Sequence, residues 1–426
     1  MHERILEQFL KVKSVTTDTR KIPADAIFFC LKGANFNGNQ FAKQALHLGA
    51  SMVVADEADA KGEERIVIVE NALSSLQELA RDYRLTFSIP FLAITGSNGK
   101  TTTKELMRDL LTRKYRVHAT QGNLNNHIGV PLTLLSMPPN TEFAIIEMGA
   151  NHQGEIKSYC QYALPDYGLI TNMGKAHLEG FGGIEGVRRG KKELYDFVHA
   201  TGGKLFVNTE LQDLREAAQG MDTVEYGFQT GGLNLNVISE SPSLVYASEY
   251  SAMRREVATQ LAGAYNLYNI ASAVAVGRYF GVNENQIHDA IEAYTPENNR
   301  SQLLKTANNI LIMDAYNANP SSMEHALMSL SRQNDKHKFF VMGDMRELGE
   351  ESEVEHRLIL AQAASLGLNG VVVGPIFKKL ENEFSFPAFN DNNEAREYLD
   401  QLELENHLIL VKGSRGIRLE EVVSAL

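Results

Sequence analysis

The sequence is poor in cysteine and has no tryptophan: Cys30 and Cys160 are the only two cysteines among 426 residues. Two cysteines cannot form the disulfide framework that stabilises many secreted domains, so the composition predicts a reducing, cytoplasmic location. No apolar run approaches the roughly 18 residues of a membrane-spanning helix. The charged start, MHERILEQFLK, also lacks the apolar core of a signal peptide. We therefore expect no membrane insertion.

An excess of positive charge is also missing. Asp and Glu outnumber Lys and Arg by 53 to 41, which gives a net charge of −12. A nucleic-acid-binding surface needs a stripe of positive charge, so this balance argues against a nucleic-acid partner. The net charge does not exclude a small anionic substrate, because a few Lys and Arg residues at the binding site are enough to hold one. Nothing in the pattern indicates an obligate subunit interface, and we expect a monomer.

The strongest motif that is present is TGSNGKTTTK at residues 95–104, which follows the apolar run FLAI and opens a helix. A glycine-rich turn between a strand and a helix presents backbone N–H groups to a phosphate. Lys100 would reach the terminal phosphates of a nucleotide, and the Thr101 hydroxyl is placed to bind Mg²⁺. The motif is shorter than the usual GxxxxGK[ST] loop, because Ile94 stands where that loop has its first glycine. The predicted ATP-phosphate residues are Thr95, Gly96, Ser97, Asn98, Gly99, Lys100, Thr101 and Thr102.

Two further apolar strands end in polar residues. The run FAIIEMGA ends at Glu147, and the run YGLITNMGKAH ends near Asn172 and His177. Because ligands of open α/β sheets bind beyond the carboxyl ends of the strands, these residues should meet the phosphate loop in one crevice. A glutamate in a buried strand is costly unless it is paired or metal-bound. Glu147 and His177 are therefore candidate metal ligands.

Two polar turns in the first 85 residues, TTDTRK and GANFNGNQF, have two interpretations. Asp, Asn and Gly suit turns by themselves. Alternatively, Asp18 and Arg20 hold an anionic ligand. The residues alone do not decide between these readings.

Two helices of the central segment carry polar residues whose role stays open. In NLYNIASAVAVG, Asn266 and Asn269 lie three residues apart on one face of an apolar helix. They could read an adenine edge, or they could cap and bridge loops. The basic run GVRRGKKELYDF is, by itself, an ordinary solvated helix face.

After residue 297 strands and helices alternate regularly, which predicts a parallel, doubly wound sheet. No GxGxxG motif follows its strands, so a dinucleotide site is not expected. Its strand ends carry Asp314 and Lys412, with Arg415 close behind, as expected where phosphates or carboxylates are held. The length predicts two or three domains, and these patterns divide the α/β protein into a small α/β domain at residues 1–85, a central P-loop ATPase-type α/β domain at 86–297 and a Rossmann-like, doubly wound domain at 298–426.

Taken in order, these stretches resemble the Mur ligase family, the ATP-dependent amide-bond synthetases of bacterial cell-wall assembly. The resemblance covers nearly the whole chain. The combination of YNANPSSM and MGDMRELG resembles the member that joins D-alanyl-D-alanine to UDP-N-acetylmuramoyl-tripeptide through an acyl phosphate. The motifs that carry the resemblance are TGSNGKTTTKE, GNLNNHIGVPLT, EMGANHQGEI, TNMGKAHLEGFG, NLYN, DAYNANPSSM, MGDMRELG and KGSR.

The resemblance implies two Mg²⁺ ions as well as ATP. Thr101 and Glu147 match ligands of the first ion, and His177 matches a ligand of the second. A carbamylated lysine supports the second ion in the family, and Lys191 falls at its position, although the neighbouring Lys192 leaves the assignment one residue open. Lys100, Lys191, His177 and Glu147 are thus the expected catalytic residues.

The remaining roles concern the two substrates. Asn266, Asn269, Arg300 and Asp314 match the adenine and ribose side of ATP, but Tyr265 stands where many relatives have His. The resemblance also favours the ligand interpretation of the first-domain turns, and it implies that residues 1–85 form a nucleotide-substrate domain. The residues expected at the UDP-muramoyl-tripeptide and D-Ala-D-Ala substrates are Asp18, Arg20, Asn37, Gly38, Asn125, Asn126, Asn317, Asn319, Lys412 and Arg415.

Three alternatives remain at this stage. The family member that adds the third peptide residue usually carries a DNPR-type motif, which this sequence lacks. Folylpolyglutamate-type or cyanophycin-type ligases would not need the first 85 residues. A regulatory P-loop ATPase would hydrolyse ATP without a small-molecule acceptor. The sequence leaves the third residue of the tripeptide and the general base for the amine unassigned.

Overall fold

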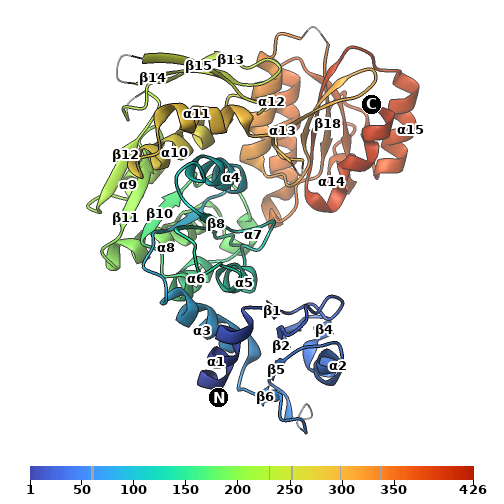
Figure 1. Cartoon of the computed structure of the whole chain (residues 1–426). Coiled ribbons are helices and arrows are strands. Elements are labelled where there is room, and N and C mark those ends of the chain that lie inside the picture. Colours follow the sequence, from blue (N-terminus) through green and yellow to red (C-terminus); the bar gives the residue numbers. More distant parts are fainter. Residues whose placement is uncertain (59–61, 230, 251–252, 298, 336) are drawn as a thin grey trace.

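The computed structural model describes residues 1–58, 62–229, 231–250, 253–297, 299–335 and 337–426. Three α/β units follow one another along the chain, and the first unit lies apart from the last across an open gap (Figure 1). The central unit contacts both. None of the described helices is long and apolar enough to cross a membrane.

The first unit is a small parallel sheet in the order β1-β2-β5-β6, with a separate hairpin of β3 and β4. The strands are short and apolar, and helices cover the sheet because each strand of a parallel sheet needs a crossover connection. Its elements are α1 (His2–Val12), β1 (Val15–Thr16), β2 (Ile27–Phe29), β3 (Lys32–Gly33), β4 (Phe36–Asn37), η1 (Gly38–Phe41), α2 (Ala42–His47), β5 (Met52–Ala55), β6 (Ile66–Ile68) and α3 (Ala72–Arg84).

Helix α3 joins the first unit to the central one. Asn71 caps its N-terminus by accepting a hydrogen bond from the N–H of Ser74. At the other end, the Tyr83 hydroxyl donates to the carbonyl of Met137, 2.8 Å away. Arg84, nearly buried, donates to the carbonyls of Ala163 and Leu164. These bonds tie α3 to the central unit, although the sequence pattern places it with the first.

The central sheet is parallel and runs in the order β12-β11-β10-β7-β9-β8. Its strands are β7 (Phe91–Thr95), β8 (Val117–Ala119), β9 (Phe143–Glu147), β10 (Tyr167–Ile170), β11 (Lys204–Asn208) and β12 (Thr223–Tyr226). Strand β7 lies between β9 and β10, so the carboxyl ends that carry the phosphate loop, Glu147 and Asn172 are adjacent. This confirms the expectation that the three strand ends meet.

The central helices pack on both faces of this sheet (Figure 1). Helices α4 and α10 bury one face, where the small residues of α10 allow close packing. The helices are α4 (Lys100–Leu111), α5 (Gly129–Leu135), α6 (Glu155–Ala163), α7 (Leu178–Phe181), α8 (Ile184–Ala200), α9 (Gln212–Ala217), α10 (Asn266–Tyr279) and α11 (Glu284–Ala293). An antiparallel sheet of β13 (Leu235–Ser239), β14 (Val245–Tyr250) and β15 (Met253–Ala258) was not foreseen from the sequence.

The C-terminal sheet runs in the order β16-β17-β21-β18-β19-β20. It is parallel as predicted except at its edge, where β16 runs antiparallel to β17. Residue 298, at which the sequence reading placed the domain boundary, lies outside the described residues. The elements are β16 (Gln302–Lys305), β17 (Ile310–Asp314), α12 (Pro320–Arg332), β18 (Lys338–Gly343), η3 (Gly349–Glu351), α13 (Ser352–Ser365), β19 (Asn369–Val373), α14 (Pro375–Lys379), β20 (Ala388–Phe389), α15 (Asn392–Leu402), β21 (Leu408–Lys412), η4 (Arg415–Ile417) and η5 (Leu419–Ala425).

Candidate active site

A cavity of about 720 Å³ opens at the carboxyl ends of β7, β9 and β10 and extends to the C-terminal unit. Polar residues from both units line it. Of the residues predicted from the sequence, those that line the cavity are Ser97, Asn98, Gly99, Lys100, Thr101, Thr102, Asn125, Asn126, Glu147, His177, Asn266, Asn269, Arg300, Asp314, Asn317 and Lys412.

The phosphate loop is packed so closely that two of its glycines cannot be replaced. A Cβ on Gly96 would lie 2.0 Å from the Thr171 hydroxyl, and one on Gly99 would lie 2.2 Å from the Asn269 amide oxygen. Both glycines also have positive φ angles, of 145° and 80°. Lys100 donates through Nζ to the Gly96 carbonyl at 2.6 Å, and burial lowers its pKa to about 8. The Lys100 amine therefore lies inside the phosphate loop, where a positive charge would stabilise a bound phosphate.

Asn172, just beyond the end of the neighbouring strand β10, holds the loop with two hydrogen bonds. Its side-chain oxygen accepts a hydrogen bond from the Asn98 N–H at 3.2 Å, and its carbonyl accepts one from the Ser97 N–H at 3.0 Å. These two loop N–H groups are thus engaged within the protein. A contact between the Asn98 N–H and a phosphate therefore stays a prediction. The N–H groups of the first turn of α4 have no intrahelical partners and remain suited to bind an anion.

Glu147 lies at the floor of the cavity and is 1% exposed. Its Oε1 accepts hydrogen bonds from the Thr101 hydroxyl at 3.1 Å and from the Asn125 amide at 2.8 Å. Its Oε2 is buried and accepts no hydrogen bond from any described residue, although Nζ of the buried Lys104 lies 3.5 Å away. An unsatisfied carboxylate oxygen beside a hydroxyl is a donor set that suits Mg²⁺. The residues present therefore fit the first cation.

Lys191 and Lys192 differ sharply in their surroundings. Lys191 is 1% exposed; its Nζ lies 3.4 Å from the carbonyl of Ala150, which lines the cavity, and 5.0 Å from the ring centroid of Phe181. Burial, together with the nearby charge of Lys100, holds the pKa of Lys191 well below its ordinary value. Lys192 is partly exposed and pairs with Asp196 one turn further along α8. Of the two, only Lys191 has an amine that is buried and has no carboxylate at salt-bridge distance among the described residues.

Asn266 and Asn269 line the cavity but also bond to the protein. The Asn269 amide nitrogen donates to Asn266 Oδ1 at 2.8 Å, and Asn269 Oδ1 accepts from the Thr103 hydroxyl at 3.1 Å. The Asn266 amide nitrogen donates to the carbonyl of Ala262 at 2.7 Å. In this structure both side chains therefore bridge neighbouring segments, the alternative left open by the sequence, and an adenine contact stays a prediction.

The C-terminal unit supplies charged residues on the opposite wall. Lys412 forms a salt bridge of 2.6 Å with Asp314. The guanidinium of Arg300 stacks 3.5 Å from the ring centroid of Tyr316. These contacts hold the charged groups of Lys412, Asp314 and Arg300 at the cavity wall.

The structure does not bring all predicted residues to the cavity. Thr95 is buried and donates through its hydroxyl to the carbonyl of Met148. Asn319 caps α12 and exchanges amide hydrogen bonds with Asn98. Arg415 pairs with Glu420 on the surface.

The candidate substrate residues of the first unit lie away from the cavity. Asp18 forms a salt bridge of 2.9 Å with Arg20, and hydrogen bonds from Arg20 lower the pKa of Asp18 to about 2. Asn37 donates to Glu57 at 3.0 Å, and Gly38 packs against the backbone of residues 30 and 31. Their role in nucleotide binding stays a prediction.

Several residues at the site were missed by the sequence reading. Lys104 is one, although its position one turn after Thr101 was a usable signal. Glu347 is another, because it approaches His177 from 170 residues further along the chain. Nothing local in the sequence indicates such a contact.

Tyr265, the departure from the family pattern, contacts the segment that leads into the C-terminal unit. Its hydroxyl hydrogen-bonds to the Ser301 hydroxyl at 2.8 Å. We expect Tyr265→Phe to lower the free energy of unfolding by about 1 kcal/mol, because one partly buried hydrogen bond is lost. Ser301→Ala should cost about as much, and the double variant little more, since the two hydroxyls share one bond. Chemical denaturation of the four proteins measures this, and fully additive losses would contradict it.

Family models match the three units in turn. The Mur ligase family catalytic domain matches residues 11–85, the Mur ligase middle domain matches 94–277, and the Mur ligase glutamate ligase domain matches 299–415.

Curated relatives and solved structures agree with these matches. The UDP-N-acetylmuramoyl-tripeptide–D-alanyl-D-alanine ligase of Bacillus subtilis is 32% identical, over 97% of this chain and 93% of the relative. Its Escherichia coli counterpart is 33% identical over 98% and 94%. Crystal structure I of MurF from Acinetobacter baumannii has a TM-score of 0.87 at 30% identity and covers 97% and 93%. MurF ligase from Thermotoga maritima, solved in complex with ADP, has a TM-score of 0.86 at 27% identity and covers 97% and 96%. This chain belongs to the Mur ligase family.

Proposed function

We propose that this chain joins D-alanyl-D-alanine to UDP-N-acetylmuramoyl-tripeptide, with conversion of ATP to ADP and phosphate, in peptidoglycan precursor synthesis. The observation that carries the proposal is the cavity itself, where the phosphate loop and Glu147 of the central unit face Asp314 and Lys412 of the C-terminal unit. The names of the relatives, similar over nearly their whole lengths, supply the substrates.

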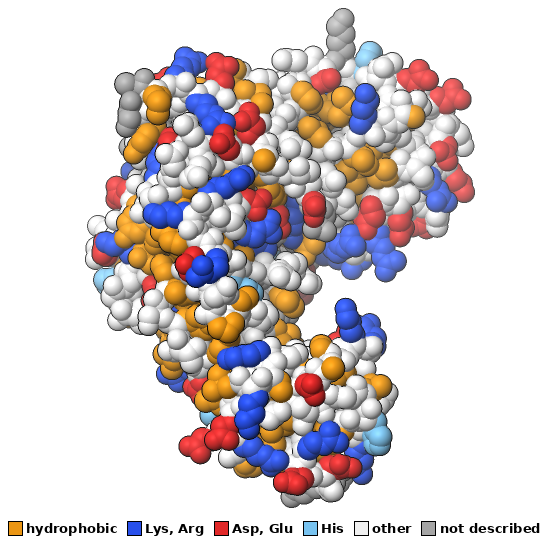
Figure 2. Space-filling view, viewed as in Figure 1, with side chains coloured by type: hydrophobic (Ala, Val, Ile, Leu, Met, Phe, Trp, Pro, Cys, Tyr) orange, Lys and Arg blue, Asp and Glu red, His pale blue; other side chains and the backbone are white. Residues whose placement is uncertain are grey.

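The proposed division of labour follows the three units. Residues 1–85 bind the uridine nucleotide, residues 86–297 bind ATP, and residues 298–426 complete the ligase site. The substrate is an anion that must extend from the first unit to the cavity. Lys and Arg side chains gather where the first and C-terminal units face each other, which suits an anion in the gap (Figure 2).

The chemistry requires activation of a carboxylate in water. The terminal carboxylate oxygen of the tripeptide attacks the γ-phosphorus of ATP, the bond to ADP breaks, and an acyl phosphate forms. The amine of D-alanyl-D-alanine then attacks the acyl carbon, loses a proton, and phosphate leaves. Both reactants of the first step are anions, so Lys100 and the N–H groups of α4 lower the barrier by holding the phosphate charge.

Thr101 and Glu147 would hold one Mg²⁺, and His177 with a carbamylated Lys191 would hold a second. When bound, these ions neutralise phosphate charge. A carbamate would turn the Lys191 amine into an anionic oxygen donor, the kind a hard cation prefers. The buried amine supports this assignment, because an unmodified ammonium there would repel a cation.

We place the enzyme in the cytoplasm as a monomer. Both cysteines are free and buried, which suits a reducing compartment.

The proposal predicts a defined product. Incubation with ATP, UDP-N-acetylmuramoyl-tripeptide and D-alanyl-D-alanine should yield a pentapeptide nucleotide, heavier than the tripeptide nucleotide by the dipeptide less one water. Mass spectrometry detects the product, and phosphate release should require both acceptor substrates. Phosphate release that ignores both would instead indicate a regulatory ATPase.

A further inference from the structure

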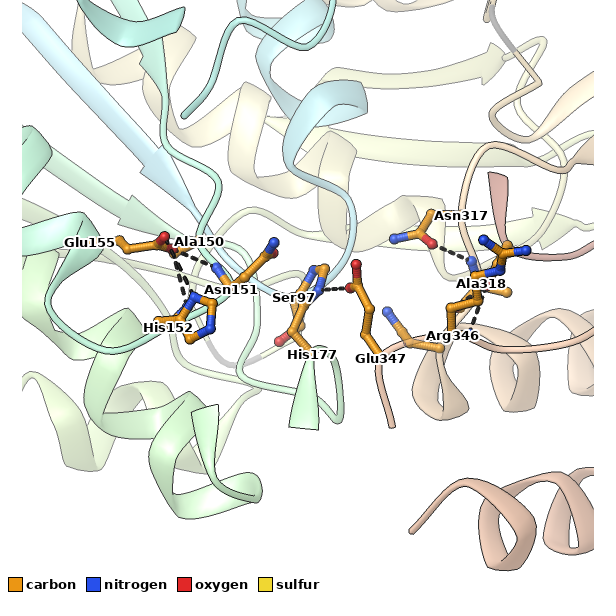
Figure 3. A network of polar contacts seen from close by, with 12 residues as sticks. Ser97, Ala150, Asn151, His152, Glu155, His177, Asn317, Ala318, Arg346 and Glu347 are labelled. Carbon is orange, nitrogen blue, oxygen red and sulfur yellow. Dashed lines mark hydrogen bonds and ion pairs between the residues drawn. The ribbon is translucent and has the colours of Figure 1, made fainter. Parts of the chain in front are cut away.

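The cavity is crossed by a contact between units that involves a predicted cation ligand. His177 follows β10 in the central unit, and its ring Nδ1 pairs with Oε2 of Glu347. Glu347 lies between β18 and η3 of the C-terminal unit. In Figure 3 the His177 ring points toward the Glu347 carboxylate, and both side chains line the cavity.

The contact determines what the His177 ring can offer. A carboxylate only accepts hydrogen bonds, so Nδ1 must carry the hydrogen. In the neutral ring the free lone pair then lies on Nε2, the other nitrogen. No described residue forms a hydrogen bond with Nε2. A carboxylate behind a histidine is the usual arrangement that orients a metal ligand.

The segments behind the two side chains are also fixed. The Glu179 N–H donates to the Glu347 carbonyl at 3.3 Å, and Lys175 forms an ion pair of 2.5 Å with the buried Glu355 of α13. Within its own unit, the Glu347 loop is held by a hydrogen bond of 2.9 Å from the Met345 N–H to Nε2 of His356. These contacts hold the segments on both sides, and they bring Glu347 to His177 only when the two units are together.

We propose that Glu347 is a positioning residue for the cation site at His177, and that it makes cation affinity at that site depend on closure of the C-terminal unit. The inference rests on the proposed role of His177. Thr101 and Glu147 both belong to the central unit, so the first cation should not depend on closure. Because linkage is reciprocal, binding of the second cation should also favour the closed arrangement.

Binding of Mn²⁺ in the presence of ADP and bicarbonate tests this, with free Mn²⁺ measured by its paramagnetic resonance signal. The wild type should bind ions in two classes. Glu347→Ala should weaken one class about 10- to 100-fold and leave the other unchanged. Glu347→Gln keeps an oxygen that can accept from Nδ1–H and should restore most of the affinity. Glu350→Ala removes an exposed carboxylate from η3, directly after the Glu347 loop, and should behave as wild type.

The remaining variants test separately the coupling to closure, the positioning role of Glu347 and the cation site at His177. Glu355→Gln breaks the other ion pair without touching His177, and it should weaken the same class while small-angle scattering shows a larger radius of gyration. If Glu355→Gln expands the protein but binds Mn²⁺ normally, the coupling to closure is wrong.

If His177→Ala weakens one class and Glu347→Ala does not, the positioning role is wrong while the cation site stands. If His177→Ala changes nothing, the proposed cation site itself fails. Equal loss in Glu347→Ala and Glu347→Gln would mean that the carboxylate binds the ion directly and would overturn the positioning role.

Discussion

Replacing Lys191 by alanine is expected to lower kcat about 10²- to 10³-fold, the usual effect of removing one preorganised charge-stabilising group. The amine is buried against Phe181 and has no carboxylate at salt-bridge distance among the described residues. Such an amine is poorly solvated as an ammonium ion and is therefore suited to react with carbon dioxide. Steady-state assays of phosphate release, with both acceptor substrates saturating, measure the loss.

Lys192→Ala is the matched control. It removes the same atoms from the adjacent residue of α8, whose amine pairs with Asp196 at the surface, and kcat should change less than about twofold because surface ion pairs contribute little. Formate or acetate should partly restore Lys191→Ala by supplying the missing carboxylate. Wild-type kcat in Lys191→Ala, with no response to removal of bicarbonate, would refute the carbamate assignment.

Lys100→Ala should lower kcat/KM by a similar factor of about 10²–10³. Nζ of Lys100 lies inside the phosphate loop, bonded to the carbonyls of Gly96 and Ser97. Its removal should leave the fold intact, since the loop is also held by Asn172. Thermal unfolding checks the fold, and phosphate release measures the activity.

Lys114→Ala is the control for this prediction. Lys114 follows the other end of α4 and donates to the carbonyls of Phe280 and Gly281 at the surface. The variant loses one positive charge, like Lys100→Ala, but far from the cavity, so its kcat/KM should stay near the wild-type value. Equal losses in both variants would mean that overall charge, rather than the phosphate loop, controls activity.

Features that depend on neighbouring residues were predictable from the sequence. The strand, glycine turn and helix at residues 91–111 were foreseen because apolar runs, glycines and a helix start leave local signals. The meeting of Glu147 with Thr101 followed from the rule that ligands of open α/β sheets bind beyond the carboxyl ends of the strands. The polar, half-exposed strands β13 to β15 were missed because their apolar pattern is weak.

Other features arise only when distant segments pack. Successive residues of a helix point about 100° apart, so the burial of Lys191 and the exposure of Lys192 depend on which face of α8 meets the sheet. The attachment of α3 to the central unit depends on carbonyls at or just beyond the ends of α5 and α6, and the pairing of His177 with Glu347 joins segments 170 residues apart. The sequence alone therefore indicated the family and the phosphate loop, and it supplied the candidate reacting residues, whose roles stay predictions. The tertiary structure alone decided which lysine is buried and which carboxylate pairs with the histidine, because side-chain direction and solvent access are set by packing within and between the units.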